Sequence, residues 1–164
     1  MSLQNLLKIG QLKEHPPNPA EIQQLLAAAQ RNLGDARARG ITPETRFDAA
    51  YKAIMQAALA AMMAHGYRPD TSRPGHHMTV VQALSLTIGL PAARITVLDT
   101  LRRKRNISDY TGLGTAIPEP TQFPAVIPGL AWFYDLSGVP RQSRPGELPA
   151  AEVRGTGWLK VVAA

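Results

Sequence analysis

Two long apolar stripes with helical spacing, each opened by a proline-containing helix start, constrain the fold of this chain more than any other feature. Asn18-Pro19-Ala20-Glu21 combines an N-cap residue, a first-turn proline and a glutamate at the capping-box position. Thr42-Pro43-Glu44 opens the second stripe in the same way. The stripes consist of Ile22, Leu25, Leu26, Ala29, Leu33 and Ala36, and of Phe47, Tyr51, Ile54, Ala58 and Met62, widened by Met55 and Leu59. Because such spacing places apolar residues on one helix face, we predict two long helices, stopped by Gly40 and capped at Gly66.

Shorter helical patterns flank these two stripes. Leu3, Leu6, Leu7 and Ile9 predict a short amphipathic helix at the N-terminus. Residues 67–75 are typical of a loop, residues 76–89 of a fourth helix, and a last helix runs from Pro91 to Gly112 with Val97, Leu98 and Leu101 as its apolar stripe. Aromatic residues make up only 5% of the chain, which favours packed helices over a β-sandwich. We therefore predict an all-α fold, an up-and-down helical bundle over residues 1–112.

The sequence changes character after Gly112. Residues 113–164 contain half of the fourteen prolines and show no helical period. Residues 130–134 and 158–162 fit short strands or docking segments, and the remainder fits an extended or disordered chain. We predict that residues 113–164 form an irregular, Pro-rich C-terminal tail, separate from the bundle.

Composition excludes several kinds of site. The chain has no cysteine, so disulfides and thiolate metal sites are impossible. His76 and His77 are adjacent, and adjacent side chains on a helix point about 100° apart, so we predict no metal site and no cofactor. The N-terminus lacks a signal peptide's cationic start and apolar core, and no apolar run approaches the length of a membrane span, so we expect a cytoplasmic protein and no membrane partner.

The charge of the chain is unevenly distributed. The net charge is +6, and residues 1–112 carry all of the excess, with fourteen Lys and Arg against eight Asp and Glu. Residues 113–164 hold four of each. A basic domain attracts nucleic acid or an acidic protein, so both are candidate partners.

The basic run Arg102-Arg103-Lys104-Arg105 is the main candidate site. At 100° per residue, Arg105 projects between Leu98 and Leu101, on the side of the helix that faces the core. One interpretation is an intrahelical ion pair with Asp109, worth roughly 0.3–0.5 kcal/mol. The other is an anion site in which Arg102, Arg105 and Asn106 donate hydrogen bonds to phosphate, with Tyr110 at its mouth.

The order of these elements resembles the HEPN domain superfamily. The resemblance covers roughly residues 19–112: a helix rich in alanine and aromatic residues, a loop, Gly75-His76-His77 at the start of a helix, and a last helix that ends in Arg105-Asn106-x-x-x-Tyr110. It implies an all-helical up-and-down bundle that forms a homodimer, and a place in a toxin–antitoxin, antiviral or RNA-processing system. Active HEPN proteins are metal-independent ribonucleases with an Arg-x(4–6)-His motif, whose arginine holds the phosphate and whose histidine moves protons.

The chain departs from that motif in two ways. Its histidine position falls at or near Tyr110, and no histidine follows Arg105. A phenol with a pKa near 10 is a poor general base at neutral pH, which favours a binding protein over an enzyme. His76 or His77 would replace the missing histidine only if folding brought it to the same groove. In addition, the proline-rich tail cannot supply the helix that normally follows the motif.

The resemblance leads to a first functional prediction. We expect a HEPN-like dimer of a bacterial stress, defence or toxin–antitoxin system that binds RNA or another phosphate-bearing partner. Its groove would be lined by Arg102, Arg105, Asn106, Asp109 and Tyr110, and extended by Arg68 and Arg73. One alternative is a metal-independent ribonuclease toxin with a degenerate site, in which Arg105 and Tyr110 are catalytic. Another is a non-catalytic subunit whose tail, through Trp132 and Trp158, binds a protein partner.

Overall fold

The structure, a computed structural model, is mostly helical. It describes the backbone of residues 1–111, 151–152 and 160–161, and the side chains of residues 1–106. The elements of the first range are α1 (Leu3–Lys8), β1 (Leu12–Glu14), α2 (Pro19–Arg37), α3 (Pro43–Ala64), β2 (Tyr67–Pro69), α4 (His76–Gln82), α5 (Leu84–Thr87) and α6 (Ala92–Thr111). β3 (Ala151–Glu152) pairs antiparallel with β4 (Lys160–Val161), which lies within the predicted segment 158–162. Residues 130–134, with Trp132, and Trp158 lie outside the described residues.

The two long helices begin at the predicted residues. The Asn18 side chain accepts a hydrogen bond from the backbone N–H of Ala20 at 3.0 Å, and Thr42 Oγ1 accepts one from the N–H of Thr45 at 3.3 Å. Both side chains cap otherwise unpaired N–H groups of a first helical turn. The prediction that Gly40 ends α2 is wrong by one turn, because the backbone of Ala38 is already extended.

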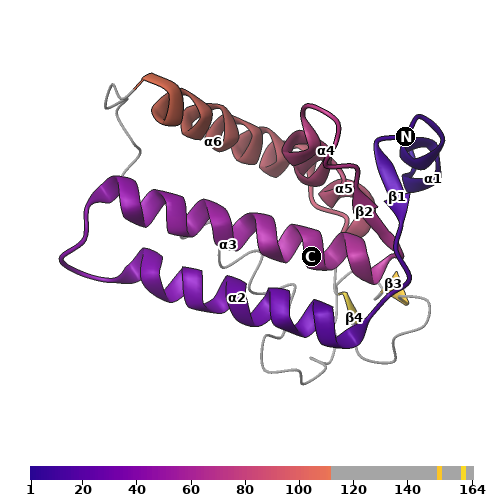
Figure 1. Ribbon diagram of the computed structural model, residues 1–164, viewed down its shortest axis with the longest axis horizontal. Coiled ribbons are helices and arrows are strands. Elements are labelled where there is room, and N and C mark those ends of the chain that lie inside the picture. Colours follow the sequence, from indigo (N-terminus) through magenta and orange to yellow (C-terminus); the bar gives the residue numbers. More distant parts are fainter. Residues whose placement is uncertain (112–150, 153–159, 162–164) are drawn as a thin grey trace.

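Helix α3 is the centre of the packing. It lies antiparallel to α2 on one side, while α4, α5 and α6 lie on its other side (Figure 1). The last two turns of α3 are almost completely buried except for Leu59, which is partly buried, and the buried residues there are Ala57, Ala58, Ala60, Ala61, Met62, Met63 and Ala64. Alanine side chains let neighbouring helices approach closely, so this small-residue segment is what allows one helix to contact several others.

Strands β1 and β2 form a short antiparallel pair that the sequence did not predict. Leu12 lies opposite Pro69 and Glu14 opposite Tyr67, and the N–H of His15 donates to the carbonyl of Gly66 at 2.9 Å. The prediction of a loop over residues 67–75 is therefore wrong at its first three residues. This pair joins the N-terminal segment, with α1, to the C-terminal end of α3.

The predicted helix over residues 76–89 is divided in two. It forms α4 and α5, which meet at Ala83. The predicted last helix is α6, and its buried face differs from the predicted stripe. Leu98 and Leu101 are buried, but Val97 is 43% exposed, which corrects that part of the stripe. Val97 lies about 100° from Leu98 around the helix, outside the arc that Leu98, Leu101 and the partly buried Ile95 share.

None of the helices in the described part of the chain is both long enough and apolar enough to cross a bilayer.

Candidate functional site

Two arginines of α6 lie on the same arc of the helix as its buried leucines. On a helical wheel Arg105 falls within about 20° of Leu98, and Arg102 within about 40°. Their side chains are accordingly only 33% and 17% exposed, whereas the Arg103 side chain is 71% exposed. A guanidinium on the inner side of a helix is costly to desolvate, so these two side chains need anionic or polar partners.

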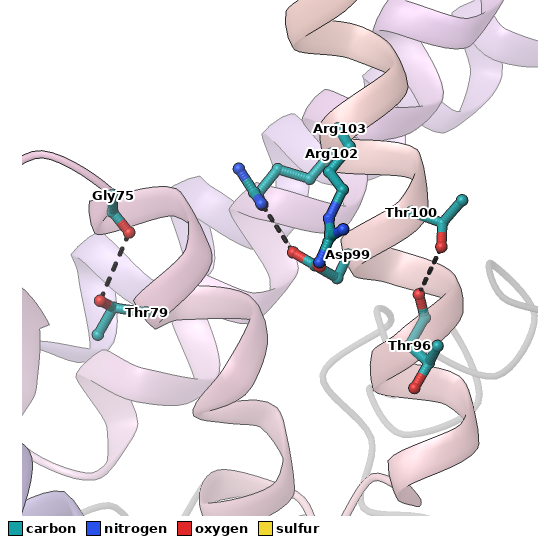
Figure 2. A network of polar contacts seen from close by, with 7 residues as sticks. All are labelled: Gly75, Thr79, Thr96, Asp99, Thr100, Arg102 and Arg103. Atoms are coloured by element: carbon teal, nitrogen blue, oxygen red, sulfur yellow. Dashed lines mark hydrogen bonds and ion pairs between the residues drawn. The ribbon is translucent and has the colours of Figure 1, made fainter.

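Asp99 holds Arg102 and Arg103. Its carboxylate accepts a hydrogen bond from Nε of Arg102 at 2.8 Å and from Nε of Arg103 at 2.9 Å. The hydrogen bond from Arg102, followed by that from Arg103, lowers the pKa of Asp99 below its ordinary value. Figure 2 shows Asp99 on the side of α6 that faces α4, with Thr96 and Thr100 on the other side. Asp99 thereby fixes the position of the Arg102 guanidinium between the two helices.

Arg105 contacts two residues of α3. Its Nε donates to a carboxylate oxygen of Asp48 at 3.3 Å, and its guanidinium carbon lies 5.1 Å from the ring centre of Tyr51. The second contact is a cation–π interaction. The Asp48 side chain is 54% exposed, so the guanidinium of Arg105 lies at the protein surface and solvent reaches this ion pair. The predicted pairing with Asp109 concerns a side chain outside those described.

The hydroxyl of Tyr51 is buried without a partner. The residue is 3% exposed, and its phenol oxygen has no hydrogen-bond partner among the residues that the structure describes. Burial raises the pKa of Tyr51, and the nearby positive charges of Arg105 and Arg102 oppose that rise. The phenol group is therefore protonated at neutral pH and able to donate a hydrogen bond.

His77, at the start of α4, is within electrostatic range of the α6 arginines. Partial removal of its ring from water lowers the pKa of His77 below 6.5, and the positive charges of His76, Arg105 and Arg102 lower it further. The rings of His76 and His77 lie edge to face with their centres 4.5 Å apart. His77 is consequently neutral at pH 7 and able to accept a proton.

We refer to Asp48, Tyr51, His77, Asp99, Arg102 and Arg105 as the α6 arginine cluster. Helices α3, α4 and α6 each contribute to it. Over residues 1–106, no group of three or more His, Asp or Glu side chains is arranged to hold a metal ion. The chemistry that the cluster offers is anion binding, by two inward-turned arginines and a phenol, beside a neutral imidazole.

The other predicted site residues lie in different places. Asn106 is exposed on α6, and Asp109 and Tyr110 lie in the last two turns of that helix, where side chains are not described. Arg68 is an exposed residue of β2, opposite Lys13. Arg73 packs against Gly10: a Cβ atom added to this glycine would lie 2.8 Å from Nη2 of Arg73. Arg68 and Arg73 thus belong to the end of the molecule formed by α1, β1 and β2.

Sequence reasoning missed three members of the cluster. Asp99 was detectable, because a carboxylate three and four residues before two arginines predicts intrahelical pairs. Asp48 and Tyr51 were not detectable as site residues, since more than fifty residues separate them from Arg105 and only the packing of α3 near α6 joins them.

Comparisons with protein-family models, with curated proteins and with solved structures give no match to this chain.

Proposed function

We propose that this chain is a HEPN-like helical protein that binds RNA through the α6 arginine cluster. The observation that carries the proposal is the state of Arg105, which is turned toward the core yet remains one-third exposed. A planar guanidinium matches the geometry of a phosphate and forms charge-assisted hydrogen bonds with it. Arg102, held by Asp99 at 2.8 Å, supplies a second, fixed positive charge nearby.

The ion pair with Asp48 does not prevent this role. Its 3.3 Å distance is long for a charge-assisted hydrogen bond, and both side chains contact solvent. Exposed ion pairs of this kind contribute about 0–1 kcal/mol to stability, so a phosphate group is able to replace the Asp48 carboxylate as a partner of Arg105. Among residues 1–106, Asp99 pairs with both Arg102 and Arg103, and Asp48 pairs with Arg105.

The test is the affinity for a fluorescent single-stranded RNA, measured by anisotropy. We expect Arg105→Ala to weaken binding by about tenfold, because one charge-assisted contact to phosphate is lost. Arg31→Ala is the matched control, since Arg31 is exposed on α2, which lies on the other side of α3 (Figure 1). Absence of binding by the wild-type chain, or equal binding by Arg105→Ala, would contradict the proposal.

A metal-independent ribonuclease is the second candidate function, and His77 is the observation that favours it. The charges of Arg105 and Arg102 act on its imidazole, and its lowered pKa leaves it neutral at pH 7. In such an enzyme, His77 would accept the proton of a ribose 2′-OH while Arg105 holds the phosphate, and Tyr110, which lies at or near the position of the motif's histidine, would be a further catalytic residue.

Incubation with purified protein separates the two functions. Cleavage of RNA in the presence of EDTA, lost in His77→Asn and in Arg105→Ala, would select the ribonuclease. Loss of cleavage in Tyr110→Phe would assign Tyr110 a catalytic role as well. RNA that stays intact while it remains bound would leave the binding protein as the function.

From the HEPN resemblance we also propose that the chain forms a homodimer and acts in a bacterial stress, defence or toxin–antitoxin system. In active HEPN proteins two copies of the motif meet across a dimer groove, so Arg105 of each protomer would line one shared site. Sedimentation equilibrium of the full chain tests this expectation, and a monomer at micromolar concentration would contradict it.

A further inference from the structure

Within the α6 arginine cluster, the hydroxyl of Tyr51 is a buried polar group that lacks a hydrogen bond to any described residue. Its oxygen is buried and finds no hydrogen-bond partner in the described part of the chain. A buried hydroxyl without a partner costs roughly 1–3 kcal/mol, and native proteins rarely keep one unless it has a role. The groups whose charges reach this hydroxyl are Arg105, Arg102 and Asp99. The unpaired donor therefore lies inside the region that the proposed function assigns to phosphate.

The cover over Tyr51 is a side chain that is able to move. The guanidinium of Arg105 lies over the ring at 5.1 Å, and one of its partners is Asp48, a residue more than half exposed. Arginine has several rotatable bonds, and a surface ion pair restrains them weakly. Displacement of this side chain would uncover the face of the Tyr51 ring over which it lies.

We propose that Tyr51 is a phosphate-binding residue of the α6 arginine cluster, covered by Arg105 while Asp48 occupies the guanidinium. A phosphodiester replaces Asp48 as the anion paired with Arg105, the guanidinium moves with it, and the Tyr51 hydroxyl donates a hydrogen bond to the same phosphate. Asp48 then acts as a competing anion built into the site. This inference rests on the proposed function, because it assigns a further ligand to the phosphate of bound RNA.

Two substitutions have opposite expected effects. Tyr51→Phe removes a donor that the free protein does not use, so we expect RNA affinity to fall about fivefold while the melting temperature stays the same or rises. Asp48→Asn removes the competing anion, so we expect RNA affinity to rise about threefold. The controls are Tyr67→Phe, a partly buried tyrosine of β2, and Glu44→Gln, an exposed carboxylate one turn before Asp48 on α3.

Anisotropy titrations with the single-stranded RNA used above measure these effects, and thermal melts of each variant measure folding. Inorganic phosphate, added as a competitor at constant ionic strength, is expected to displace RNA better than chloride does, and to do so less well from Tyr51→Phe. The inference is overturned if Tyr51→Phe binds RNA like the wild type while Arg105→Ala does not, or if Tyr51→Phe melts at a clearly lower temperature. It is also overturned if Asp48→Asn gains no more affinity than Glu44→Gln, or if phosphate and chloride compete equally. Absence of RNA binding by the wild-type chain would instead remove the proposed function as well.

Discussion

Asp48 and Asp99 form different kinds of ion pair with the arginines of α6. Asp99 precedes Arg102 and Arg103 by one helical turn, so the helix itself sets the contact, and the 2.8 Å distances show close pairing. Asp48 reaches Arg105 from another helix at 3.3 Å and is largely exposed. The first carboxylate therefore positions a guanidinium, while the second is an exchangeable partner. A run of four cations consequently contains one arginine that is held by a carboxylate of its own helix and one that reaches across to α3.

His77 allows a direct measurement of how close these groups are. Because the charge of Arg105 contributes to lowering the pKa of His77, Arg105→Ala should raise that pKa toward 6.5, whereas Arg31→Ala should not. The unfolded chain takes up the proton first as the pH falls below 6.5, so stability decreases from pH 6.5 down to the lower folded pKa of His77, and that loss remains at lower pH. An NMR titration of the imidazole protons in the three proteins gives the values, and equal pKa values in all of them would separate His77 from the cluster.

At this scale the sequence predicted the arginines and missed their α3 partners. Helical periodicity places Arg105 beside Leu98 and Leu101, and that inference needs only one helix. Asp48 and Tyr51 join Arg105 only because α3 and α6 pack near one another, which no local pattern encodes. The position of His77 relative to the arginines likewise depends on how α4 packs against α6, which no local pattern encodes.

Among the elements, α6 has the buried face that decides where its arginines point. Leu98 is 1% exposed, whereas its neighbour Val97 is 43% exposed. We expect Leu98→Ala to lower the free energy of unfolding by about 2–5 kcal/mol, because it leaves a cavity in the core. Val97→Ala should change it by less than about 0.5 kcal/mol. Urea denaturation measures both. Equal losses would mean that Val97 and Leu98 are equally buried. The buried face of α6 would then be centred between them, with Arg102 at the edge of that face farthest from Val97.

A glycine inside α2 and a glycine just after α3 allow two alanine substitutions with opposite expected effects on stability. Gly34 lies inside α2 with open space around the position of a Cβ atom, so Gly34→Ala should raise the free energy of unfolding by about 0.5–1 kcal/mol. Gly66 follows α3 with a φ of 86°, a left-handed conformation that disfavours a side chain, so Gly66→Ala should lower it by about 1–2 kcal/mol. Calorimetric melts compare the two proteins, and stabilisation by Gly66→Ala would contradict the described end of α3.

Helix starts were more predictable than strands or helix ends. The Asn18 and Thr42 caps act within three residues, so the sequence carries the whole signal for the starts of α2 and α3. Strands β1 and β2 have three residues each and pair across more than fifty positions, which leaves too short a pattern to recognise. The division of residues 76–89 at Ala83 has no glycine or proline to mark it.

Over the whole molecule, the positive charge is spread much more widely than the cluster. All of the net charge of +6 belongs to residues 1–112, and exposed arginines also occur on α2 and near β2. A dispersed charge and a localised site predict different salt dependences, because each phosphate contact releases counterions. For single-stranded nucleic acid the slope of log affinity against log salt is about −0.7 per contact. Arg105→Ala should therefore make the slope shallower by about 0.7, while Arg31→Ala, on the far side of α3, should leave it unchanged. If both variants change the slope equally, RNA binds to the basic surface as a whole, and the inward position of Arg105 has no part in its recognition.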